Sequence, residues 1–211
     1  MKFRHELKYI CSEAELQIIE ARIKSVCHID SHAGNAGTYQ IRSVYFDNVN
    51  DTCFYENENG SDPREKIRIR AYNCDSSYIS LERKRKERAM THKDSRRLSL
   101  EECNSLIHDK YIDSRLGCMY PKVLVVYERT PYVYEVGNVR ITFDRNISSS
   151  SNIDDFFNKD ALLRPVMPTG KQLLEVKYDE ILPDYLYNMM NLGSLQQTAF
   201  SKYYMCRKFC L

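Results

Sequence analysis

Long apolar runs are missing from this sequence of 211 residues. No stretch approaches the roughly 18 consecutive apolar residues of a membrane-spanning helix. The start, MKFRHELKYICSEAEL, also lacks the apolar core of a secretion signal. We therefore expect a cytoplasmic protein with no membrane segment of its own. The length of the chain suits a single domain over residues 1–211.

An excess of charge of one sign is missing as well. The chain has 31 Lys and Arg against 29 Asp and Glu, a formal net charge of +2. This balance excludes the uniformly basic proteins that coat nucleic acid, so we expect no nucleic-acid partner. Any site for an anion has to come from a local arrangement of cations.

Metal-binding cysteine motifs are absent. The eight cysteines form no C-x-x-C pair, and Cys206 with Cys210 has no second ligand pair at zinc-like spacing. Without a secretion signal, we expect all eight to be reduced thiols that pack as small core residues.

Alternation of polar and apolar residues dominates what is present. It predicts strands at about 2–10, 39–47, 64–73, 77–88, 90–98, 122–135, 138–146 and 171–180. Helices are predicted at 12–26 and 99–109, where Ser12 with Glu15 and Ser99 with Glu102 form capping boxes, and around 183–192 and 194–209. Eight strands without βαβ alternation indicate an α+β fold with an antiparallel sheet or closed barrel.

The stretch REKIRIRAYN, residues 64–73, places three cations on one strand face, namely Lys66, Arg68 and Arg70. Other predicted strands also carry Lys or Arg on one face, often beside a carboxylate. Each strand alone fits a solvated outer face. Together their bias in sign favours an absent polyanion and a divalent metal, because Arg and Lys bind phosphate oxygens and carboxylates hold hard cations.

Eight short motifs carry a resemblance: RHELKY, SVYFDN, KIRIRAY, LERK, YERTPY, VRITFDR, LLEVKY and FSKYY. They occur in the order seen in VTC-type (vacuolar transporter chaperone) polyphosphate polymerase domains, and the chain resembles that family from residue 4 to about 208. The family belongs to the triphosphate tunnel metalloenzymes, together with the CYTH phosphatases. The resemblance implies an antiparallel eight-stranded barrel with flanking helices, one of them C-terminal, around a hydrophilic tunnel.

The resemblance also implies site residues. Residues that grip phosphates in the tunnel would be Lys8, Arg68, Arg70, Lys84, Lys93, Arg129, Arg140 and Lys177, with Ser201 and Lys202 as a contact at one end. Glu175 looks like the carboxylate for Mn²⁺ or Mg²⁺, and Glu6 is a second candidate. The CYTH phosphatases begin with Glu-x-Glu-x-Lys, whereas this chain has Arg4-x-Glu6-x-Lys8, a departure toward the polymerases.

The sequence favours a phosphotransferase of the polyphosphate polymerase type, and two alternatives stay open beside it. The favoured function is polyphosphate synthesis, in which the γ-phosphate of ATP is added to a polyphosphate chain and ADP is released. The alternatives are hydrolysis of triphosphate or nucleoside triphosphates, and a non-catalytic polyphosphate-binding module. The family's polymerases often act with membrane proteins that remove the product, so such a partner is also open.

Overall fold

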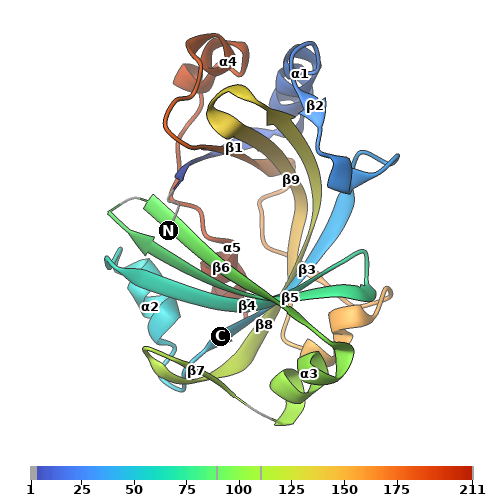
Figure 1. Cartoon of the computed structure of the whole chain (residues 1–211), viewed down its shortest axis with the longest axis vertical. Helices are drawn as coiled ribbons and strands as arrows, with labels where there is room; N and C mark the ends of the chain where they lie inside the picture. The colour runs from blue at the N-terminus through green and yellow to red at the C-terminus, as the bar shows by residue number, and fades with distance from the viewer. Residues whose placement is uncertain (1–3, 89, 110, 211) are drawn as a thin grey trace. The chain divides into compact units, whose positions relative to one another are not determined.

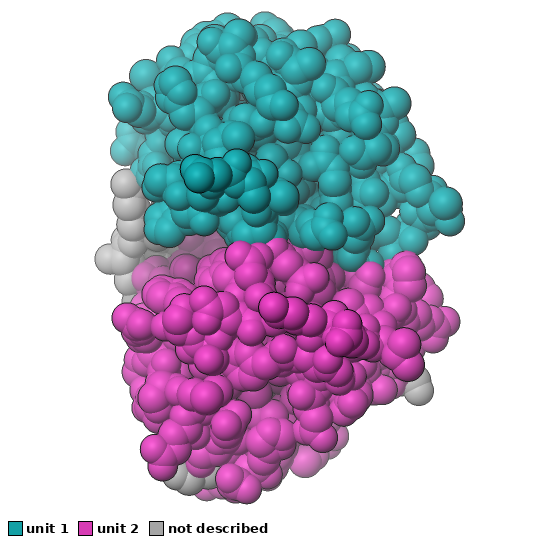
Figure 2. All heavy atoms as spheres, turned by 90° about the vertical axis from the view of Figure 1, so that its right-hand side faces the viewer, with its two compact units in different colours: residues 1–39, 128–147, 167–200 teal, residues 40–127, 148–166, 201–211 magenta. Residues whose placement is uncertain are grey.

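The computed structural model describes residues 4–88, 90–109 and 111–210. Two compact units divide the chain (Figure 2). Unit 1 comprises Met1–Tyr39, Glu128–Ile147 and Met167–Phe200, and unit 2 comprises Gln40–Tyr127, Ser148–Val166 and Ser201–Leu211. Each unit is therefore assembled from three separate stretches of the chain.

Eight main strands form an antiparallel sheet (Figure 1). They are β1 (His5–Ser12), β3 (Tyr39–Asp47), β4 (Arg64–Tyr72), β5 (Asp75–Glu87), β6 (Met90–Leu98), β8 (Gly117–Tyr134), β9 (Val139–Ser150) and β11 (Lys171–Tyr178). Their order is β1-β11-β9-β8-β3-β4-β5-β6. The short strands β2 (His28–Ile29) and β7 (Ile112–Ser114) pair with β8, and the short strand β10 (Arg164–Pro165) pairs with β9. The predicted α+β class and antiparallel strands are confirmed, while closure into a barrel with a tunnel stays a prediction.

The predicted strand boundaries are close to those observed. The first strand was expected at 2–10 and runs as His5–Ser12, with residues 2 and 3 outside the described part of the chain. The strand expected at 122–135 begins earlier, at Gly117, because the hairpin with β7 extends it.

Two helices begin at the predicted capping boxes. These are α1 (Glu13–Ile23), capped by Ser12 and Glu15, and α3 (Leu100–Asn104), capped by Ser99 and Glu102. A π-helical turn, Ser105–Asp109, follows α3 and completes the helix predicted at 99–109. Short 3-10 turns lie at Ser31–Ala33, Val136–Asn138, Ile153–Phe157 and Leu192–Ser194.

The C-terminal helices are shorter than the sequence predicts. They are α4 (Asp184–Met189) and α5 (Lys202–Lys208), where the pattern predicted 183–192 and 194–209. The residues before α5 run alongside β1 instead: Gln197 bridges to Tyr9, and the backbone N–H of Thr198 donates to the carbonyl of Lys8. These tertiary hydrogen bonds outweigh a weak local helix propensity.

An unpredicted helix, α2 (Thr52–Glu58), lies in unit 2. Its N-cap residue, Asp51, is left-handed (φ 51°) and makes no side-chain cap. The cap comes instead from Asp47 at the end of β3, whose carboxylate accepts hydrogen bonds from the backbone N–H groups of Cys53 and Phe54. A cap that comes from outside the helix gives no capping signal in the local sequence.

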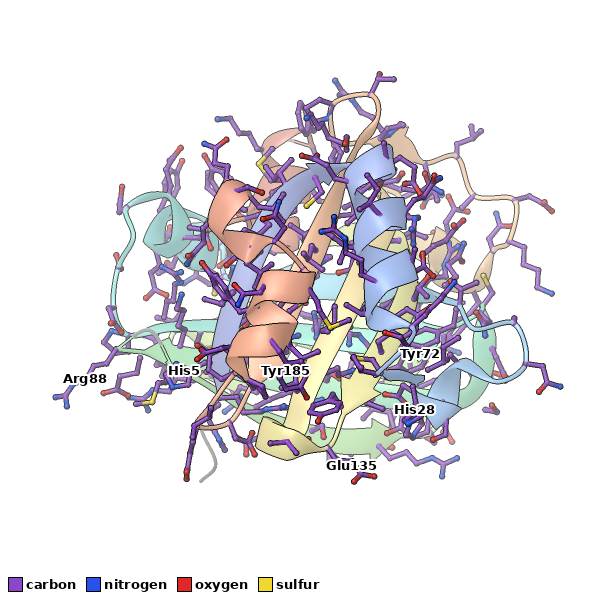
Figure 3. All side chains as sticks on the ribbon, turned by 90° about the horizontal axis from the view of Figure 1, so that it is seen from above. His5, His28, Tyr72, Arg88, Glu135 and Tyr185 are labelled. Carbon is purple, nitrogen blue, oxygen red and sulfur yellow. The ribbon has the colours of Figure 1, made fainter. Side chains whose placement is uncertain are left out.

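The core of unit 1 lies between helices and sheet. Figures 1 and 3 show α1 and α4 side by side over the strands β1 and β9. Leu16, Ile19 and Ile23 of α1 and Leu186 of α4 are buried in one cluster with apolar residues of these strands. Each such side chain contributes about 1.5–3 kcal/mol by its burial. The opposite strand face, with its polar residues, points away from this core.

In unit 2 the alternation in β4 is observed directly. Ile67, Ile69 and Ala71 are fully buried on one face, and the alternating Lys66, Arg68 and Arg70 lie on the other. Phe46 is the register partner of Ile67 and Val44 that of Ile69. Apolar cross-strand pairs fix the register, so the positions of the cations follow from the packing.

All eight cysteines lie in the described ranges as free thiols, five of them buried. Burial raises the pKa of Cys27 to about 11 and those of Cys11 and Cys103 to about 12. We expect Ellman's reagent at pH 8 to modify Cys74, Cys118 and Cys210 rapidly and the other five only after unfolding. Rapid reaction of all eight thiols in the folded protein would contradict the buried assignment. Separately, no helix in the described part of the chain is long and apolar enough to cross a membrane.

Candidate functional site

The central feature of unit 2 is a buried carboxylate among cations. Glu82 of β5 is 2% exposed, and its Oε2 accepts hydrogen bonds from Nε and Nη2 of Arg68 at 2.8 and 2.6 Å. Its Oε1 accepts from Nζ of Lys93 at 3.1 Å, and Nη1 of Arg70 lies 3.8 Å from Oε2. Burial acts to raise the pKa of Glu82, but its three cationic neighbours outweigh burial and lower this pKa. Glu82 is therefore ionised at neutral pH.

Arg70 has a different environment from Arg68. It is 7% exposed, and it donates hydrogen bonds to neutral oxygens, Oγ of Ser43 at 3.4 Å and the Tyr127 hydroxyl at 3.2 Å. Its register partner on β5, Ser80, is 2% exposed, and within the described residues the Ser80 hydroxyl has no hydrogen-bond partner. A buried guanidinium beside a buried hydroxyl that has a hydrogen bond left to make fits an anion with several acceptor oxygens.

Three lysines lie side by side across β4, β5 and β6. Lys66 is the register partner of Lys84, and Lys84 is that of Lys93. Side chains directly opposite one another in antiparallel strands are about 4.5–5.5 Å apart at Cβ, and like charges in such pairs are destabilising. A row of three therefore has a cost in stability, which a bound anion would offset.

The last helix adds further polar groups in unit 2. Nζ of Lys66 donates to Oγ of Ser201 at 2.6 Å, and Nζ of Lys202 lies 4.8 Å from the centre of the Tyr127 ring. Tyr203 donates its hydroxyl to the buried Asp47, the residue that caps α2. This contact fixes α5, and with it Ser201 and Lys202, against α2.

The corresponding polar face of unit 1 is built around Glu175 of β11, which is 4% exposed. Its Oε2 accepts from Nη2 of Arg129 at 3.2 Å and from Nζ of Lys177 at 3.0 Å. Its other oxygen lies 3.8 Å from Nζ of Lys8, its register partner on β1. Burial lowers the pKa of Lys177, and the nearby carboxylates only partly compensate.

Arg129 has a second carboxylate partner, Asp144 of β9. Nε and Nη2 of Arg129 donate to the two oxygens of Asp144, both at 2.6 Å. The Asp144 side chain is fully buried and that of Arg129 is 8% exposed. This two-point contact fixes the plane of the guanidinium, which stays within hydrogen-bond distance of Glu175.

Lys8 has a second carboxylate partner, and two further cations of unit 1, Arg140 and Arg4, are also paired with carboxylates. Lys8 lies 3.3 Å from Glu6, and Arg140 donates to Asp30 at 2.9 Å and to the Tyr39 hydroxyl at 3.2 Å. Arg4 forms an ion pair with Asp179 at 2.8 Å. The cation in place of the first Glu of the phosphatase pattern is thus held by a carboxylate of the same unit.

The two units differ in charge balance. On the polar face of unit 1, four carboxylates accompany four cations: Glu6, Asp30, Asp144 and Glu175 with Lys8, Arg129, Arg140 and Lys177. In unit 2, Glu82 accompanies six cations: Lys66, Arg68, Arg70, Lys84, Lys93 and Lys202. Excess positive charge is therefore concentrated in unit 2, whereas carboxylates and cations balance on the polar face of unit 1.

Comparison with known proteins identifies the family. A family model described as the VTC domain matches residues 3–117 and 117–211. The chain belongs to the VTC domain family. Among curated proteins, none matches it.

Two solved structures share the fold of this VTC domain. The PH1819 protein from Pyrococcus horikoshii OT3 is 14% identical, with a TM-score of 0.57 over 98% of this chain and 99% of that one. A putative adenylate cyclase from Bacillus halodurans is 13% identical, with a TM-score of 0.56 over 95% of this chain and 94% of that one. At such low identity the similarity establishes the fold alone.

Glu6 and Glu175 are the carboxylates of this VTC domain that fit a divalent metal. Within the described residues, no group of three or more His, Cys, Asp or Glu is placed to hold a metal ion. Glu6 and Glu175 share both Lys8 and Lys177 as neighbours, at 3.0–3.9 Å. Because Mg²⁺ is usually bound through one or two carboxylates, waters and substrate phosphates, this pair suffices for a phosphate-bound metal. It does not form a protein cage for a resident ion.

The residues predicted from the sequence thus fall into two groups. Unit 1 brings together Glu6, Lys8, Arg129, Arg140, Glu175 and Lys177, and unit 2 brings together Arg68, Arg70, Lys84, Lys93, Ser201 and Lys202. The predicted site residues did not include Asp30, Lys66, Glu82, Tyr127 and Asp144, although Lys66 was noted in the cation row of residues 64–73. For Lys66, Glu82 and Asp144 the signal was present, because each lies in phase with a predicted site residue on its own strand.

Proposed function

We propose that this VTC domain binds a phosphate chain and transfers the γ-phosphate of ATP to its end, so that polyphosphate grows and ADP is released. The row Lys66–Lys84–Lys93, beside Arg68 and Arg70, carries the proposal. Side-by-side lysines repel one another unless an anion of matching length lies over them. A linear polyphosphate, with a negative charge on each phosphate, is such an anion.

Phosphoryl transfer requires mainly position and neutralisation of charge from a protein. In this proposal Arg68, Arg70 and the three lysines hold the phosphates by charge-assisted hydrogen bonds. Arg129, whose plane is fixed by Asp144, lies beside Glu175 on the polar face of unit 1 and adds a positive charge there. The attacking atom is an oxygen of the terminal phosphate of the chain, the bond to the γ-phosphorus breaks on the ADP side, and ADP leaves with that electron pair. No protein nucleophile takes part.

A divalent cation, Mn²⁺ or Mg²⁺, would be held by Glu175 with Glu6 and would neutralise charge on the phosphates of ATP. The lysines that now contact these carboxylates, Lys8 and Lys177, would then be available to phosphate oxygens. The presence of this carboxylate pair beside the cations supports an enzyme over a plain polyanion-binding module, because binding of a polyanion alone needs no metal carboxylate.

A triphosphatase is the second candidate, with water in place of the chain end. Arg4 argues against it, because the phosphatase pattern has a Glu there and Arg4 is instead engaged with Asp179. A cation at this position removes one metal carboxylate. The polymerase reading therefore has the better support.

We expect purified protein to extend a tripolyphosphate primer when incubated with ATP and Mn²⁺, and to release ADP in equal amounts. Gel electrophoresis of the product and chromatography of the nucleotides measure both. Free phosphate without longer chains would identify a triphosphatase. Neither product, with tight tripolyphosphate binding in titration calorimetry that weakens steeply with salt, would identify a binding module.

A further inference from the structure

Glu82 is an unexpected residue to find in a site for a polyanion. It is 2% exposed and carries a negative charge within the cation cluster of unit 2. Lys93 contacts one oxygen and Arg68 the other, so both carboxylate oxygens are engaged. A charge of the same sign as the ligand at this place must weaken binding of phosphate.

The contact with Arg68 has a specific geometry. Glu82 accepts from Nε and Nη2, the pair of N–H groups that guanidinium uses for two-point contact with phosphate. Nη1 of Arg68 donates to the Tyr45 hydroxyl at 2.6 Å. Three of the five N–H groups of Arg68 are thus engaged within unit 2, and its best edge for phosphate is occupied by a carboxylate.

Arg70 makes the contrast clear. On the same strand face, its guanidinium donates to neutral oxygens at 3.2 and 3.4 Å and lies 3.8 Å from Glu82. Arg70 can therefore form a strong contact with phosphate, and Arg68 cannot do so unless the phosphate competes with Glu82. The two arginines therefore differ in how strongly they can bind phosphate, because the Glu82 carboxylate engages Arg68 and not Arg70 at hydrogen-bond distance.

We propose that Glu82 is a resident counter-anion of the phosphate site, which competes with the phosphate chain for Arg68 and limits how tightly the site holds it. This proposal rests on the proposed function. A processive polymerase must release each phosphate so that the chain can advance, and a site that holds its ligand too tightly slows that step. Glu82 lowers affinity in exchange for faster turnover.

The variant Glu82→Gln tests this directly, because it removes the charge and keeps an oxygen that accepts from Arg68. We expect tripolyphosphate to bind about tenfold more tightly at low salt. In the polymerisation assay, KM and kcat should fall together, because release becomes slower. A residue with a merely structural role would not tighten binding.

Glu65 of β4 provides a matched control. It is 6% exposed and lies on the face of β4 opposite to Arg68 and Arg70. Its carboxylate oxygens lie 3.9 Å from Arg83 and 3.9 Å from Arg115. Glu65→Gln makes the same change of charge at similar burial, and we expect it to leave tripolyphosphate affinity unchanged. Equal tightening in both variants would attribute the effect to net charge and would overturn the proposal, as would unchanged or weaker binding by folded Glu82→Gln.

The pair variant Glu82→Gln with Arg68→Gln removes one charge of each sign and covers the case in which Glu82→Gln alone does not fold. We expect it to bind tripolyphosphate within about threefold of the wild type, whereas Arg68→Gln alone should lose about tenfold or more. If the pair variant binds no better than Arg68→Gln, Glu82 does not oppose phosphate. Failure of the proposed function is distinguishable, because the wild-type protein itself would then not bind tripolyphosphate.

Discussion

Glu175→Gln is expected to lower ATP-dependent polyphosphate synthesis by on the order of a hundredfold or more, while tripolyphosphate binding stays intact or becomes tighter. Glu175 has three cationic neighbours in unit 1, namely Lys8, Arg129 and Lys177. Loss of its charge removes the candidate metal ligand and leaves these cations for phosphate. Turnover and affinity should therefore change in opposite directions.

Arg70→Ala provides the contrast. In the proposed site Arg70 would contact phosphate in the ground state and in the transition state alike, so its loss should weaken binding as well as turnover. A hydrogen bond to a charged group contributes about 1.5–3 kcal/mol, which corresponds to roughly a tenfold to hundredfold loss of tripolyphosphate affinity. Titration calorimetry and ADP release measure the two quantities for each variant.

Glu128→Gln is the control for this pair of variants. Glu128 precedes Arg129 on β8, is exposed, and contacts the side chain of Asn146 at 3.2 Å. We expect wild-type turnover, and melting temperatures should show that all three variants are folded. If folded Glu175→Gln retains near-wild-type turnover, its carboxylate is a structural partner of Arg129 and Lys177 and no metal ligand.

The alternation of the strands made much of this fold predictable. In residues 64–73 the period of two placed Lys66, Arg68 and Arg70 on one face, and the structure has them there because Ile67 and Ile69 are fully buried on the other. The helix starts at Ser12 and Ser99 were predictable for a similar reason, since a capping box is local in sequence.

Features that depend on distant residues were not predictable. The cap of α2 comes from Asp47, and the segment before α5 is extended through contacts with β1. Likewise, Glu82 and Asp144 could be assigned to a face, but their partners depend on which strands are neighbours and in which register. A single sequence indicates which residues of a strand share a face, but it does not indicate which strands are neighbours or in which register they pair.

Asp144→Asn is expected to cost about 3–5 kcal/mol in the free energy of unfolding, the largest effect on stability that we predict. The fully buried Asp144 accepts two hydrogen bonds from Arg129, both at 2.6 Å. Asparagine keeps the shape, but its amide presents N–H groups to one of the guanidinium nitrogens, so two donors face each other. Arg129 then keeps its contact with the Glu175 carboxylate, at 3.2 Å.

Urea unfolding of Asp144→Asn, followed by circular dichroism, measures this loss. Replacing both partners, as Arg129→Met with Asp144→Leu, should restore most of the stability, because a buried ion pair replaced by apolar groups of similar volume is often neutral. The pair variant should nevertheless lack polymerase activity, since Arg129 is gone. Glu128→Gln, on the adjacent exposed position, should change stability by less than about 0.5 kcal/mol. A similarly small change in Asp144→Asn would mean that Asp144 does not fix Arg129, and the orientation of this guanidinium would then need another cause.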